Sequence, residues 1–103
     1  MIFEKLSLIK GEQAKEFNFA SKTLEGYRKK IDKIDENIIK LIEKRLDYSR
    51  RIGEYKKKNG IKIVDLKREK EILDYRTRKS RLSNDFTKKL FSIIIKESRA
   101  VQI

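Results

Sequence analysis

The sequence predicts an all-α protein with three helices per chain, the first of them very long. The chain contains no proline and only four glycines, so few residues would interrupt a helix. Apolar residues recur at steps of three and four, the spacing of one helix face. Charged residues make up 43% and apolar residues 38% of the 103 positions. This composition favours long amphipathic helices over a sheet.

The first helix is expected to run from about Thr23 to Lys58. The positions of its apolar face are Leu24, Tyr27, Ile31, Ile34, Ile38, Leu41, Ile42, Leu46, Ser49, Ile52 and Tyr55. Ser21 or Thr23 can cap its start, and Gly60 can end it because glycine adopts the left-handed conformation. With a rise of 1.5 Å per residue, this helix would be about 50 Å long. This length exceeds the dimensions of a compact monomer of this size, so we expect a partner to cover the helix.

Two shorter helices follow. Asp65 is a predicted N-cap for a helix over residues 66–79, with apolar contacts from Leu66, Ile72 and Leu73. Ser83 is a predicted N-cap for a helix over residues 84–103. The expected buried face of this last helix consists of Phe86, Leu90, Phe91, Ile94, Ile95 and Val101.

We divide the chain into an N-terminal arm, residues 1–21, and one helical domain, residues 22–103. The pattern leaves the structure of the arm open between a mobile segment and a short helix lined by Ile2, Leu6 and Ile9 and ended by Gly11. Phe17 and Phe19 are candidates for docking on the domain. The arm lacks a secretory signature, and no apolar run is long enough to cross a membrane. We therefore expect a cytoplasmic protein.

The composition restricts the chemistry. The chain has neither cysteine nor histidine, which excludes disulfides, thiol nucleophiles, the usual zinc sites and the commonest general base. We expect no metal and no cofactor. The net charge of +12 favours anionic partners.

Helical spacing places polar residues in line with apolar ones. On the first helix Arg45, Ile52 and Lys56 share one stripe, because steps of seven and eleven residues return to the same face. A lone cation on such a stripe usually reaches past it to solvent. However, Ile95, Ser98 and Gln102 form a similar stripe on the third helix, and Asp65, Arg68 and Glu69 start the second. Packing the helices together is predicted to gather these groups around one pocket for a small hydroxylated dianion.

Residues 24–102 resemble the all-helical (AroQ) class of chorismate mutase. The resemblance rests on an ordered set of segments: "YRKKIDKID", "LIEKR", "IGEYKKKNG", "VDLKREKEIL" and "FSIIIKESRAVQ". No single segment is specific, but the full set with matching separations is. It implies that residues 22–103 are a chorismate mutase domain, which forms an intertwined antiparallel helical homodimer with shared active sites. The arm has no counterpart in the minimal family pattern.

The resemblance also implies roles for individual residues. Arg45 and Arg28 of the partner subunit would pair with the two carboxylates of chorismate. Lys56 would bind a carboxylate and the ether oxygen, and Gln102 would donate a second hydrogen bond to that oxygen. The remaining implied substrate contacts are Asp65 and Glu69 at the ring hydroxyl, Arg68 in support, Ser98 at a carboxylate, and Ile52 and Ile95 as apolar walls.

The implied reaction fits the absence of histidine and cysteine. Chorismate rearranges to prephenate, in tyrosine and phenylalanine biosynthesis, within one molecule and without proton transfer, nucleophile or metal. Catalysis then needs a restricted, compact substrate conformation and positive charge at the ether oxygen. Arg28 and Lys56 are 28 residues apart, about 42 Å along a continuous helix, so they would serve one site only from different chains.

Three alternatives stay open. The same scaffold can support a lyase that removes pyruvate from isochorismate. A nucleic-acid-binding helical protein would use the basic runs at residues 56–58 and 76–81, although few aromatic residues interleave them. A purely structural or regulatory dimer is the third, and an intact pocket argues against it.

Overall fold

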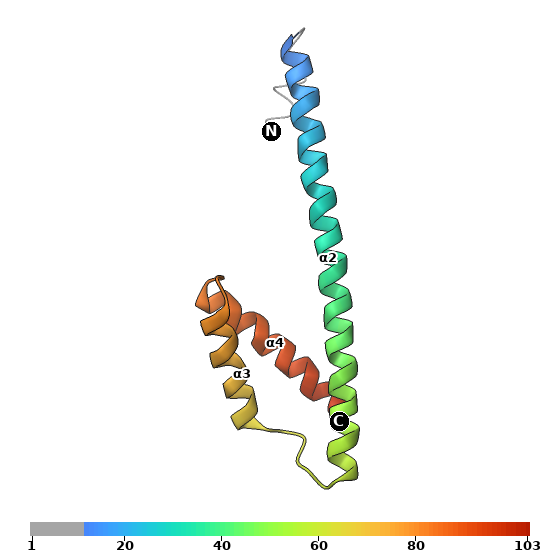
Figure 1. Ribbon diagram of the computed structural model, residues 1–103, viewed down its shortest axis with the longest axis vertical. Helices are drawn as coiled ribbons and strands as arrows, with labels where there is room; N and C mark the ends of the chain where they lie inside the picture. The colour runs from blue at the N-terminus through green and yellow to red at the C-terminus, as the bar shows by residue number, and fades with distance from the viewer. Residues whose placement is uncertain (1–11) are drawn as a thin grey trace. The chain divides into compact units, whose positions relative to one another are not determined.

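The structure, a computed structural model, describes residues 12–103, with side chains from Ser21 onward. It contains three helices, α2 (Glu12–Lys58), α3 (Leu66–Lys79) and α4 (Asn84–Gln102), and no strand in this range (Figure 1). The predicted all-α class is therefore confirmed. The chain divides into two compact units, Met1–Lys40 and Leu41–Ile103, and α2 contributes residues to both.

The predicted start of the long helix was wrong. α2 begins at Glu12, so Ser21 and Thr23 lie inside the helix and cannot cap it. Residues 12–22 contain neither proline nor glycine and are rich in Glu, Lys, Gln and Ala, which favour helix. Nothing in this segment interrupts the helical backbone, so the helix continues through both candidate caps.

Part of the predicted arm lies outside the described residues. Ile2, Leu6, Ile9 and Gly11 fall there, as do the side chains of Phe17 and Phe19. The arm as a segment separate from the domain stays a prediction.

The other helix ends follow the sequence signals. Gly60 has φ 65°, and the Ile61 N–H donates to the Lys56 carbonyl at 2.8 Å, which closes α2 with a Schellman motif. The Asp65 carboxylate accepts from the Arg68 N–H at 3.0 Å, and the Ser83 hydroxyl accepts from the Phe86 N–H at 3.1 Å. Both predicted N-caps are therefore confirmed.

The second unit has a small core where α3 and α4 pack together. Ile72 and Ile95 are buried, and Leu90, Phe91, Ile94 and Val101 are half-buried. The prediction was wrong for Leu66 and Phe86, whose side chains are 70% and 53% exposed. Both occupy the first turn of their helices, where no described residue covers them.

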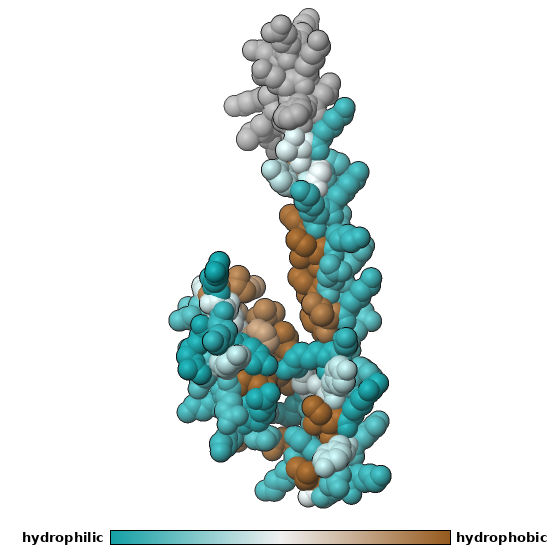
Figure 2. All heavy atoms as spheres, in the orientation of Figure 1, coloured by the Kyte–Doolittle hydropathy of each residue, from teal (hydrophilic) through white to brown (hydrophobic). Residues whose placement is uncertain are grey.

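The first unit presents apolar side chains that nothing in it covers. Its described residues belong to α2 alone, and Tyr27, Ile31, Ile34 and Ile38 are 47% to 61% exposed. Figure 2 shows hydrophobic residues gathered along one side of this helix. A contiguous apolar stripe of this kind marks an interaction surface. Within residues 12–103, no helix is sufficiently long and apolar to cross a bilayer.

Candidate active site

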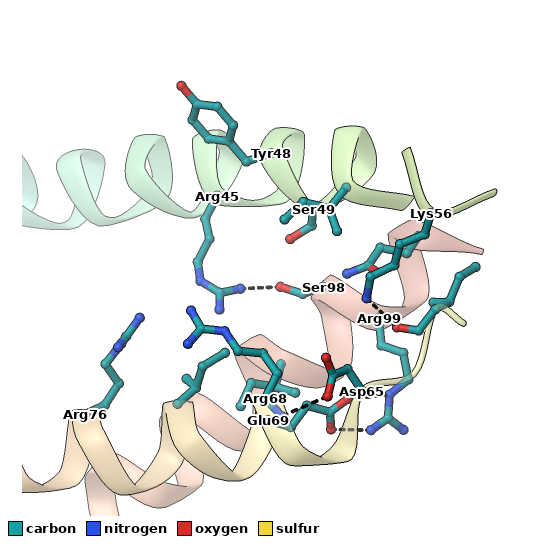
Figure 3. A pocket seen from close by; sticks show the side chains of 15 residues that line it. Arg45, Tyr48, Ser49, Lys56, Asp65, Arg68, Glu69, Arg76, Ser98 and Arg99 are labelled. Carbon is teal, nitrogen blue, oxygen red and sulfur yellow. Dashed lines mark hydrogen bonds and ion pairs between the residues drawn. The ribbon is translucent and has the colours of Figure 1, made fainter. Parts of the chain in front are cut away.

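A cavity of about 300 Å³ lies within the second unit, between the C-terminal part of α2 and the helices α3 and α4 (Figure 3). The structure brings nine predicted site residues to its wall: Arg45, Ile52, Lys56, Asp65, Arg68, Glu69, Ile95, Ser98 and Gln102. Arg28, the tenth, belongs to the first unit and does not line the cavity. The convergence of three helices on one space follows from the stripes described above.

Arg45 is fixed at the α2 wall by a contact with α4. Its Nη1 donates a hydrogen bond to the hydroxyl of Ser98, which is buried. Burial, and then the neighbouring charges of Arg76 and Arg68, lower the pKa of the Arg45 guanidinium. An arginine keeps its proton in proteins despite such a shift. The cavity therefore holds a cation whose surroundings disfavour its charge, and a bound anion would relieve this.

Lys56 lies on the same stripe of α2 as Arg45, about three turns further along and near the start of α3 (Figure 3). Its Nζ donates to the carbonyl oxygen of Ile63 at 2.9 Å, which draws the half-buried ammonium toward the cavity. An ammonium has three donors, so two remain for a ligand. Among the described residues no carboxylate forms an ion pair with Lys56.

The end of α4 is held against α2, which positions Gln102. A Cβ placed on Gly53 would lie 2.7 Å from the Gln102 Cα and 2.8 Å from its carbonyl oxygen. Only a glycine permits this approach. Lys57 adds a hydrogen bond from its Nζ to the Ile103 carbonyl. The Gln102 Oε1 is a buried acceptor without a hydrogen-bond partner in the described chain, while the NH2 group of the same amide supplies the donors that a ligand oxygen could accept from.

The carboxylates of the site are both engaged at the start of α3. Asp65 caps the helix through its Oδ1. The Glu69 carboxylate accepts two hydrogen bonds from the Arg99 guanidinium. The Nε donates to Oε2 at 3.2 Å, and the Nη2 donates to Oε1. This fork fixes the orientation of the Glu69 carboxylate. Each carboxylate oxygen accepts about two hydrogen bonds, so Glu69 retains acceptor sites for a ligand.

Six lining residues were missed by the sequence analysis. They are Tyr48, Ser49, Ile63, Ile72, Arg76 and Arg99. Helical spacing carries the signal for two of them. Arg99 lies four residues after Ile95 and three before Gln102, and Arg76 lies seven after Glu69. The same steps of three and four residues, applied between Ile95 and Gln102 and over two turns beyond Glu69, would have found both.

The cavity wall carries an excess of positive charge. Its cations are Arg45, Lys56, Arg68, Arg76 and Arg99, and its carboxylates are Asp65 and Glu69. Five cations against two carboxylates leave an excess of three. Within the described part of the chain, only Arg99 among these cations forms an ion pair. The arrangement suits a small ligand with more than one negative charge.

Comparison with known proteins gives a consistent set of relatives. The family profile described as chorismate mutase type II matches residues 27–103. A chorismate mutase of Methanocaldococcus jannaschii is 40% identical over 79 residues, which cover 73% of this chain and 79% of that protein. A bifunctional chorismate mutase/prephenate dehydratase of Buchnera aphidicola is 38% identical over 80 residues, 75% of this chain but 21% of that protein.

A solved structure also matches. A conserved hypothetical protein from Pyrococcus furiosus aligns with a TM-score of 0.66 and 38% sequence identity. The alignment covers 79% of this chain and 96% of that one.

Proposed function

The chain belongs to the chorismate mutase type II family, and from this we propose that it catalyses the rearrangement of chorismate to prephenate in tyrosine and phenylalanine biosynthesis. One observation carries the proposal. Arg45, Lys56 and Gln102 line one cavity of about 300 Å³, each with hydrogen-bonding capacity left for a ligand. That volume is at the lower end of small-molecule sites.

The proposed reaction needs only positioning and charge. One C–O bond of the ether breaks while a C–C bond forms in the same molecule, and no proton is gained or lost. Arg45 binds a carboxylate through its remaining N–H donors and holds the folded conformer. Lys56 and the Gln102 amide donate to the ether oxygen, on which negative charge develops. Because these donors are fixed before the substrate arrives, they stabilise the transition state without reorganising.

The remaining residues recognise the rest of the substrate. Glu69, oriented by Arg99, accepts from the ring hydroxyl together with the region of Asp65. Arg68 supports this end of the site, and Ser98 meets a carboxylate beside Arg45. Ile52 and Ile95 provide the apolar walls against which the ring packs.

We further propose that the active form is an intertwined antiparallel homodimer with shared sites. Two observations support this. The apolar stripe of the first unit is exposed in the single chain, and Arg28 lies in that unit rather than at the cavity. A second copy would cover the stripe, and Arg28 of the partner subunit would supply the cation for the second carboxylate. A cytoplasmic location stays a prediction.

The test is turnover of chorismate by the purified protein. Loss of chorismate absorbance with prephenate as the product is the expected result, and the Lys56→Ala variant is the matched control for a contaminating activity. Release of pyruvate from isochorismate, without prephenate from chorismate, would assign the lyase reaction instead. No reaction with chorismate by a folded protein would overturn the proposal.

A further inference from the structure

Arg76 lines the cavity but has no part in the reaction proposed above. It lies on α3, one turn beyond buried Ile72 and two turns beyond Glu69. Its side chain is half-buried and extends from α3 toward α2, at the same end of the cavity as Arg45 (Figure 3). Lys56 and Asp65 mark the opposite end.

Arg76 has no anionic partner within the described residues. Its guanidinium lies near the ring of the adjacent Tyr75, with the ring centroid 5.4 Å from the guanidinium carbon. An arginine has five N–H donors, and a contact with a ring face consumes none of them directly. The guanidinium therefore reaches the cavity with its donors available.

The surroundings of Arg76 are cationic. The pKa of Arg45 is lowered by burial and, next, by the charge of Arg76, so the two guanidinium groups act on one another. Arg68 adds a third positive charge. Of the two carboxylates in the wall, Asp65 caps the start of α3 and Glu69 is paired with Arg99. Like charges held together in this way disfavour the empty site and favour an anion between them.

We propose that Arg76 is a further substrate-binding residue, which grips with Arg45 the substrate carboxylate that lies farther from Lys56. The inference rests on the proposed function, since it assigns one carboxylate of chorismate to each end of the cavity. A carboxylate accepts about four hydrogen bonds, enough for two guanidinium groups. The resulting subsite is built within one chain and adds to the cation supplied by Arg28 of the partner subunit.

The experiment compares Arg76→Gln with Arg78→Gln. Both changes remove one arginine charge from α3, but Arg78 is exposed and does not line the cavity. We expect Arg76→Gln to raise the KM for chorismate about tenfold or more, with a smaller change in kcat, because a charged hydrogen bond to bound substrate is lost. Arg78→Gln should stay within about twofold of the parent, the effect of a distant charge.

A second variant guards against misfolding. Arg76→Lys keeps the charge but loses the planar fork, so its KM should fall between those of the parent and Arg76→Gln. Sedimentation of each variant reports whether its subunit assembly is unchanged.

The outcomes separate the two proposals. An equal KM for Arg76→Gln and Arg78→Gln, in an active parent, would overturn the role of Arg76 alone. The Arg76→Gln variant could instead dissociate into monomers and show the parental KM when its subunits reassociate. That result would assign Arg76 to the subunit interface and would also overturn its proposed role in substrate binding. A parent that does not convert chorismate would instead overturn the proposed function, and this inference with it.

Discussion

The two units of the chain follow the same amphipathic pattern but differ in whether their apolar side chains are buried within the chain. The second unit buries Ile72 and Ile95 and encloses a cavity. The first leaves Tyr27, Ile31 and Ile34 more than half exposed. They also differ in charge: the second unit has 19 lysines and arginines against 9 acidic residues, net +10, and the first has 9 against 7, net +2. Periodicity thus shows that a face is to be covered, but not whether the same chain covers it.

The largest expected effect tests whether the first unit of one chain supplies Arg28 to the cavity in the second unit of the other chain. Arg28→Ala and Lys56→Ala should each lower kcat/KM by about 10² to 10³, as expected for removing a charged contact to the transition state. A heterodimer of the two variants would contain one intact site and one doubly damaged site. Refolding an equal mixture should give about half heterodimers and so restore roughly a quarter of parental activity.

The control for this experiment is each variant refolded alone. If heterodimers form and no activity returns, Arg28 acts within its own chain or has no role. The apolar stripe of the first unit would then have to be covered by something other than a second copy that shares its active site.

The next effect concerns Gln102, the proposed donor to the ether oxygen. An amide does not titrate, so the parent should keep this hydrogen bond at all ordinary pH. In Gln102→Glu the donor exists only while the carboxyl is protonated, and the reference pKa of glutamic acid is about 4.3. We expect activity that is highest in acid and lost as pH rises toward neutrality, measured as a pH profile of kcat/KM. Parental activity of this variant at pH 8 would remove Gln102 from the mechanism.

A pair of glycine variants tests the packing of each unit. In Gly53→Ala the new methyl group meets Gln102 backbone atoms, so α4 must shift. We expect kcat/KM to fall by about 10² or less, because Gln102 is displaced. The free energy of unfolding should fall by about 1–3 kcal/mol from overpacking, partly offset by the better helix propensity of alanine. Gly26→Ala, in the first unit, meets nothing within 4 Å and should stabilise the protein by about 0.4–1 kcal/mol.

Thermal unfolding and initial rates measure both glycine variants. Unchanged kinetics in Gly53→Ala would show that Gln102 tolerates displacement.

The smallest effect is electrostatic. The excess charge of the second unit should attract a dianion at long range, and salt screens such attraction over about 10 Å at 0.1 M. We expect kcat/KM to fall a few-fold between low and physiological ionic strength while kcat changes less. A flat salt dependence would leave the proposed reaction intact but would remove the role of net charge in substrate capture.

What could be predicted from the sequence was mainly local. The stop at Gly60 and the caps Asp65 and Ser83 depend on groups a few residues apart, so the sequence signals sufficed. The start of α2 was missed because a favourable cap does not end a helix that nothing else interrupts. Exposure of Leu66 and Phe86 depends on which surfaces meet, which spacing within one helix does not report.

The site shows the same division. Stripes on the first and last helices, together with three residues at the start of the second, were enough to name nine residues that share one cavity. The fork between Arg99 and Glu69 joins positions 30 residues apart, and neither residue's own helix indicates it. The close approach of Gly53 to Gln102 likewise depends on how two helices cross.

The turn between α3 and α4 bears on the order in which the protein folds. Thr87 is 1% exposed, and its hydroxyl donates to the Ser83 carbonyl at 2.9 Å, while the Leu82 N–H donates to the Ser80 hydroxyl at 2.9 Å. These bonds span only a few residues, and contacts so near in sequence form quickly. The α3–α4 hairpin should therefore form in an early step whose rate is independent of protein concentration. Capture of a second chain would follow in a slower step that accelerates with concentration, and stopped-flow refolding at two concentrations would separate them.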